Sequence, residues 1–133
     1  MRAAFGMLAV ALTLGGCGLD VRGADLFLMT RAGQGMKLTL LVNDSGTISC
    51  NGGHAKQLSD PLLLQARDLA NSLDSDAQAG LHIRPGADSV YSYSVKLPNG
   101  TVTFPDTAGL AHPELAQAES FALHAAQQTC GIS

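Results

Sequence analysis

Between residues 24 and 50 short apolar segments are separated by turn-forming residues. In the clearest segment, MKLTLLVN at 36–43, every second side chain is apolar. Such alternation is typical of a strand that buries one face. The segments ADLFLMTR at 24–31 and TISC at 47–50 also read as strands, and the sequences AGQG and NDSG between the segments favour turns. We therefore predict three consecutive strands.

The period changes in LSDPLLLQARDLANSL, residues 58–73. Here the apolar side chains recur every three or four residues, as on one face of an α-helix. They are Leu62, Ala66, Leu69 and Leu73. Ser59 or Asp60 can cap the start of such a helix, and Pro61 is tolerated in its first turn. We predict a helix over this segment.

The second half of the chain predicts a hairpin and a second helix. SVYSYSVKLPNGTVTF, residues 89–104, alternates again, and Asn99-Gly100 suits a tight type I′ turn. The Ala-rich segment from Pro113 to Cys130 returns to helical spacing, and small residues along one side of it allow close packing on a sheet. The predicted stripe is Leu115, Ala118, Ala122, Ala125, Ala126 and Thr129. The resulting order, β-β-β-α-β-β-α, predicts an α+β domain, in which two helices pack on one face of an antiparallel sheet of four to five strands.

The N-terminus has a different pattern, a single basic residue followed by a short apolar run. Arg2 precedes AAFGMLAVALTL at 3–14, which is shorter than the about 20 residues that a helix needs to cross a bilayer but matches the apolar part of an export signal. The next sequence, LGGC at 14–17, resembles the lipobox of bacterial lipoproteins. In that family a diacylglyceryl group is attached to the cysteine, and a peptidase cuts just before it.

This resemblance implies that residues 1–16 are removed as a signal peptide and that Cys17 becomes the lipidated N-terminus. Residues 17–23 then form a short tether, and residues 24–133 form a single α+β domain. The implied location is the extracytoplasmic face of the bacterial cell membrane, either Gram-negative or actinobacterial. The alternatives are an ordinary secreted protein with a coincidental cysteine, or a short membrane anchor.

The charge balance narrows the class of partner. The chain has 8 Lys and Arg against 11 Asp and Glu, a net charge of −3, which becomes about −4 when Arg2 is removed with the signal. No cluster of basic residues is visible, which argues against binding to nucleic acid or to anionic lipid headgroups. We expect contact with the membrane through the lipid on Cys17, and any further partner to be an envelope protein of unknown identity.

Two cysteines, Cys50 and Cys130, are left once Cys17 carries lipid. In an oxidising space outside the cytoplasm two such cysteines most simply pair, and neither has a His or Cys at the spacing of a zinc site. Cys50 shares one side of its strand with Ile48, and Cys130 follows Ala126 on the packing side of the last helix. We predict a disulfide between sheet and helix.

The sequence contains no motif for catalysis, metal or cofactor. The four histidines lack the HExxH pattern and fall in predicted loops or helix flanks. They are His54, His82, His112 and His124. Asp74 and Asp76 resemble the start of a calcium loop whose later ligands are missing, so we assign both to the loop after the first helix. A G-x-S-x-G motif is absent as well. We predict a non-catalytic protein with no cofactor.

Over most of the domain the chain resembles actinobacterial lipoproteins of unknown function. The segments that carry the resemblance are KLTLLVNDSGTISCNGG, LSDPLLLQARDLANSL, SVYSYSVKLPNGTVTFPDTA and the helix ending at Cys130. The family implies a lipid-anchored single domain and brings no activity with it. Our leading hypothesis is a binding or interaction module of the cell envelope. Its contact site is placed at Ile83, Arg84 and Pro85, in the loop HIRPGADS.

Two other functions are open on the sequence. The order of elements is loosely similar to that of the Streptomyces subtilisin inhibitors, whose reactive loop lies ahead of a late hairpin. That resemblance implies an extracellular protease inhibitor with Arg84 as the specificity residue, although in that family cysteines brace the loop and here no cysteine lies beside it. The other function is the carriage of an apolar ligand beneath the sheet.

Overall fold

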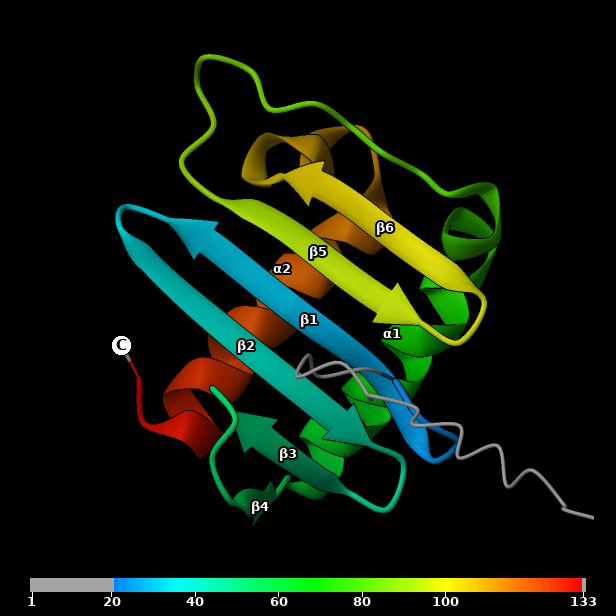
Figure 1. The fold of residues 1–133 in the computed structure, drawn as a ribbon, viewed down its shortest axis with the longest axis vertical. Helices are drawn as coiled ribbons and strands as arrows, with labels where there is room; N and C mark the ends of the chain where they lie inside the picture. Colours follow the sequence, from blue (N-terminus) through cyan, green and yellow to red (C-terminus); the bar gives the residue numbers. More distant parts are fainter. Residues whose placement is uncertain (1–20, 133) are drawn as a thin grey trace, which may run out of the picture.

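Six antiparallel strands form one sheet, and two helices cover one of its faces (Figure 1). The structure is a computed structural model that describes residues 21–132, so the predicted signal peptide and Cys17 lie outside the described residues. The strands are β1 (Asp25–Gly33), β2 (Met36–Asn43), β3 (Thr47–Cys50), β4 (Ala55–Gln57), β5 (Ser92–Leu97) and β6 (Gly100–Pro105). Their order in the sheet is β4-β3-β2-β1-β5-β6. The predicted α+β class is confirmed.

The sheet has one strand more than the upper limit of the predicted four to five. The extra strand, β4, pairs through its backbone with β3, where Lys56 lies opposite Ile48. All three residues of β4 are exposed, so this segment lacks the apolar alternation that marks a half-buried strand. Its position at the edge of the sheet depends on backbone pairing, which the pattern of side chains does not reveal.

Alternation along the strands sorts the side chains onto two faces. On β1, Phe27 and Met29 are buried and belong to the core under the helices. Between and beyond them, Leu28, Thr30 and Ala32 point to the opposite side, because successive side chains of a strand alternate. We call this second side, together with the side chains in register with it on the other strands, the open face. It faces the viewer in Figure 1, with the helices behind.

Helix α1 (Asp60–Ala79) begins and ends at well-defined caps. The Ser59 hydroxyl accepts a hydrogen bond from the backbone N–H of Leu62, and Gly80 closes the other end in the left-handed conformation, with φ 64°. The helix therefore extends six residues beyond the predicted end at residue 73. The assignment of Asp74 and Asp76 to a loop was wrong, because both lie within the helix, whose buried stripe continues to Ala77.

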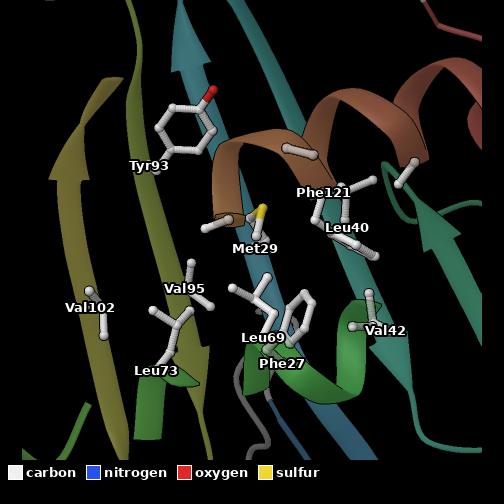
Figure 2. Packing of buried hydrophobic residues seen from close by; sticks show 14 of the residues in the cluster. Phe27, Met29, Leu40, Val42, Leu69, Leu73, Tyr93, Val95, Val102 and Phe121 are labelled. Carbon is white, nitrogen blue, oxygen red and sulfur yellow. The ribbon is translucent and has the colours of Figure 1, made fainter. Parts of the chain in front are cut away.

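Helix α2 (Pro113–Ala125) continues as a π-helical turn, Ala126–Cys130, and packs against the same face of the sheet. Its Phe121 ring meets the Phe27 ring of β1 edge to face, with centroids 5.5 Å apart. Figure 2 shows Phe121 beside Leu40 and Phe27, with Leu69 and Leu73 of α1 in the same layer. Among the described helices, none is long and apolar enough to cross a membrane.

The predicted disulfide between Cys50 and Cys130 is present. It joins the last residue of β3 to the last residue of the π-helical turn, and the two Cα atoms are 5.9 Å apart. Both cysteines are half-buried and pack against the core, as their predicted positions on the strand and helix require. The bridge fastens the C-terminal end of the chain to the half of the sheet that β2, β3 and β4 form.

Candidate functional site

A loop between α1 and β5 runs along the outer edge of β6 and is fastened at both of its ends. At the first end, the backbone N–H of Ile83 donates to Thr103 (2.9 Å), and the N–H of Thr103 donates to Leu81 (3.0 Å). At the second end, the Asp106 carboxylate accepts hydrogen bonds from the N–H groups of Val90 and Tyr91, each at 3.1 Å. The intervening residues 84–89 stand clear of the sheet at the top of Figure 1.

A surface pocket of about 240 Å³ opens between this loop and the open face of the sheet. Small side chains and two aromatic residues from three neighbouring strands line it, together with residues of the loop. The strand residues are Thr30, Ala32, Ser92, Tyr93, Ser94, Thr103 and Phe104, and the loop residues are His82, Ile83 and Pro85. The accessible surface of this lining is almost entirely apolar.

The three loop residues singled out from the sequence differ in their position. Ile83 is half-buried and Pro85 is exposed, and both line the pocket. Arg84 lies between them in the chain but is exposed and is not part of the lining. The structure thus brings Ile83 and Pro85 together with strand residues that the sequence analysis did not identify. The sequence signal for five of them is a small side chain at alternate positions over part of β1, β5 and β6: Thr30, Ala32, Ser92, Ser94 and Thr103.

His82 is a pocket-lining residue whose side chain can act as an acid or a base. Its Nδ1 atom is hydrogen-bonded to the Thr103 hydroxyl. A hydroxyl nucleophile with a histidine base also needs a group that orients the imidazole. Within residues 21–132 no carboxylate is hydrogen-bonded to His82, so the pair lacks this third group.

On the helix side of the sheet, a separate group of titratable residues surrounds Glu119 of α2. Burial and the nearby Asp106 carboxylate raise the pKa of Glu119 to about 7. Burial, followed by the charge of Glu119, also raises the pKa of Tyr93. Partial burial acts against ionisation of Asp106, but the hydrogen bonds from Tyr91 and Val90 outweigh it and lower its pKa. The group is part of the packing between α2 and the sheet, and of its members only Tyr93 also lines the pocket.

A second acidic group joins the end of α1 to the start of α2. His112 lies beside Glu114, with 3.5 Å between Nδ1 and Oε1. Burial, and then the adjacent Glu114 carboxyl, raise the pKa of Asp76, whose Oδ2 atom is buried without a hydrogen-bond partner. In the described part of the chain no group of three or more His, Cys, Asp or Glu side chains is arranged to hold a metal ion.

The remaining histidines lie at the surface or near it. His54 is exposed in the segment before β4, and His124 is half-buried on α2. Neither is near the pocket lining. These positions agree with their assignment to loops and helix surfaces.

Comparison of the chain with known proteins yields no match: no protein-family model, no curated protein and no solved structure matches it.

Proposed function

We propose that this chain is a lipid-anchored module of the bacterial cell envelope that binds a protein partner through the pocket between the 82–85 loop and the open face. The observation that carries the proposal is the pocket itself, with small side chains as its floor and a fastened loop as its wall. Its volume of about 240 Å³ lies below the roughly 300–1,000 Å³ of typical small-molecule sites. A pocket of this size suits one or two side chains of a protein partner.

Lipid anchoring rests on the resemblance of LGGC, residues 14–17, to a lipobox. Two acyl chains give stable attachment where a single chain gives marginal binding. Val21 follows Cys17 by four residues, a span of at most about 14 Å in an extended chain. The chain then turns into β1, where the N–H of Arg22 donates to the Asp25 carboxylate at 3.0 Å. The tether therefore joins the domain at the N-terminal end of β1.

The pocket lies toward the other end of β1. Thr30 and Ala32, which line it, follow Asp25 by five and seven residues. At about 3.3 Å per residue the pocket is roughly 20 Å away along the strand. This separation supports a module that holds one end near the membrane and presents its pocket to the space beyond it.

The test uses the full-length protein in its own envelope with a photoreactive amino acid at Ala87, in the exposed part of the loop. Ser94→Phe places a large ring in the pocket. Ser49→Phe is the matched control, because Ser49 is on the open face of β3, about 14 Å away across three strand spacings. We expect one specific protein adduct that Ser94→Phe abolishes, that Ser49→Phe preserves and that Cys17→Ala reduces by removing the anchor. An adduct unaffected by Ser94→Phe would contradict the proposal.

One observation favours a second function, inhibition of an extracellular protease. Arg84 is exposed in the loop between α1 and β5. Hydrogen bonds to Thr103 fix one end of this loop, and hydrogen bonds to Asp106 fix the other. Among the described residues no disulfide lies beside the loop. A braced, exposed basic residue is what a trypsin-like enzyme accepts in its specificity pocket. We expect slow-tight inhibition that Arg84→Ala removes. Rapid cleavage after Arg84, or no effect on trypsin-like and subtilisin-like enzymes, rules this function out.

No corresponding observation favours an apolar-ligand carrier. The side chains of Leu40, Leu69 and Phe121 are buried between the sheet and the helices, in the space that such a ligand needs. The proposal therefore does not extend to ligand carriage.

A further inference from the structure

The open face carries positive charge in a chain that is acidic as a whole. Of the strand residues on this face, the charged ones in the described chain are Lys37, Lys96 and Asp25, whereas the net charge of the whole chain is −3. Asp25 lies opposite Asn43 and accepts a hydrogen bond from the Asn43 side-chain amide at 3.1 Å. Most of the others are hydroxyl residues: Thr30, Thr39, Thr47, Ser49, Ser92, Ser94, Thr101 and Thr103. Asp25 lies five residues before Thr30 on β1 and also accepts a hydrogen bond from the Arg22 backbone N–H, so the charged strand residues nearer the pocket are the two lysines. Such a region on an acidic protein selects the charge of what binds to it.

The register of the sheet places the two lysines beside the pocket. Lys37 lies directly opposite Ala32, and Lys96 is two residues from Ser94 on the same side of β5. Both Ala32 and Ser94 line the pocket. Both lysines are exposed, and neither forms an ion pair with another described residue. Their charges are therefore free to meet a partner.

The nearby acidic residues do not cancel this charge. Asp106 is occupied by the backbone N–H groups of Val90 and Tyr91 and lies at the end of β6. Asp88 is exposed in the loop, which also carries the opposite charge of Arg84. The third strand lysine, Lys56, lies opposite Ile48, whose side chain points to the core, so Lys56 is on the helix side of the sheet edge. It offers a natural control.

We infer that the partner presents an extended acidic segment, with an apolar side chain that enters the pocket and carboxylates that meet Lys37 and Lys96. This inference rests on the proposed binding function. The two lysines are separated by two strand spacings across the sheet and by four residues along it, or about 16 Å between their Cα atoms. An extended chain covers that distance in about five residues. The recognised pattern is thus two acidic residues four to five positions apart with an apolar residue between them.

The experiment uses a water-soluble carbodiimide on the full-length lipidated protein in its own envelope. The reagent joins a lysine amine to a carboxylate in direct contact. We expect partner carboxylates to be joined to Lys37 and Lys96 and not to Lys56, with Ser94→Phe abolishing these links and Ser49→Phe preserving them. In addition, Lys37→Glu/Lys96→Glu should reduce the Ala87 photoadduct at least about fivefold, whereas Lys56→Glu should leave it unchanged.

The outcomes separate the inference from the function on which it rests. If the photoadduct depends on Ser94 but the lysine reversals leave it unchanged, the acidic partner is ruled out and the binding function stands. If the carbodiimide joins partner carboxylates to Lys56 alone, the acidic partner is also ruled out and the binding function stands. If no adduct depends on Ser94, the binding function fails, and the inference fails with it. Raising the salt concentration should weaken the association, because exposed charges are screened over about 8–10 Å.

Discussion

Gly100 at the turn between β5 and β6 lies directly against the backbone of Ala77 in the last turn of α1. A Cβ atom at Gly100 would be 2.8 Å from the carbonyl carbon of Ala77 and closer still to its oxygen, and Gly100 has a φ of 152°. The neighbouring Asn99 side chain donates to the Asp74 carboxylate at 2.8 Å. The end of the first helix and the tip of the hairpin are therefore in backbone contact, and the contact requires glycine.

We expect Gly100→Ala to lower the free energy of unfolding by about 2–4 kcal/mol, because the methyl group overlaps the Ala77 peptide in a region of φ that alanine disfavours. Denaturant unfolding of the purified domain measures this loss. Gly86→Ala is the matched control, because nothing lies within 4 Å of its added Cβ and its φ is not positive. Equal stability of the two variants would show that the helix and the turn separate at little cost.

Removal of the disulfide should destabilise the fold. The sequence separation between Cys50 and Cys130 is 80 residues, for which the chain-entropy estimate is about 4.5 kcal/mol, and measured values commonly fall below such estimates. We expect the Cys50→Ser/Cys130→Ser variant to lose about 2–4.5 kcal/mol and to be insensitive to reductant. If reduction of the wild-type protein leaves its unfolding midpoint unchanged, this prediction is wrong.

Glu119 should make stability depend on pH. Its pKa in the folded protein is raised to about 7 from an ordinary value of 4.5, so the folded state binds the proton more tightly than the unfolded state. The raised pKa therefore has no effect on the free energy of unfolding below about pH 4.5, and it lowers this free energy as the pH rises from about 4.5 to 7. We expect Glu119→Gln to gain stability relative to wild type over this interval and to match it at pH 4.

The measurement is the unfolding midpoint of both proteins at intervals between pH 4 and pH 8. Asp68→Asn, at an exposed position on α1, controls for the loss of one negative charge. If the curves of wild type and Glu119→Gln run parallel, Glu119 ionises alike in the folded and unfolded states.

Phe121 should be a major contributor to the core. Its side chain is fully buried against the Phe27 ring. Truncation by Phe121→Ala removes this contact and leaves a cavity, at a cost of about 3–5 kcal/mol. Leu123→Ala, two residues away on the same helix but 46% exposed, should change stability by about 0.5 kcal/mol or less. Calorimetry of both variants checks the difference, and comparable losses would contradict the packing seen here.

The local patterns predicted most of the elements, because each depends on neighbouring residues. Period-two alternation located β2, short apolar segments between turn residues located β1 and β3, and Asn99-Gly100 located the turn of the β5–β6 hairpin. The errors arose where tertiary contacts extend an element. Asp74 and Asp76 continue α1 because Ala77, further along, is buried. The three exposed residues of β4 are a strand because β3 supplies a partner.

The second helix also has features that local patterns predicted and others that tertiary contacts decide. Its small residues predicted close packing, and Ala118 and Ala122 are indeed buried. Phe121 was not included in the predicted stripe, although it is the largest buried side chain of α2. The width of the buried stripe depends on how the helix crosses the sheet, and helical periodicity in the sequence does not specify that angle.

The sequence by itself determined the α+β class, the position of both helices, the pairing of Cys50 with Cys130 and the loop that contains Ile83 and Pro85. These features follow from periodicity, from turn residues and from the number of cysteines, all of which are local or countable. Only the tertiary structure decided that β1 pairs with β5, a strand about 60 residues later in the chain. That pairing brings Thr30 beside Ser94 and so creates the pocket, because a pocket on a sheet requires strand neighbours that no local pattern encodes.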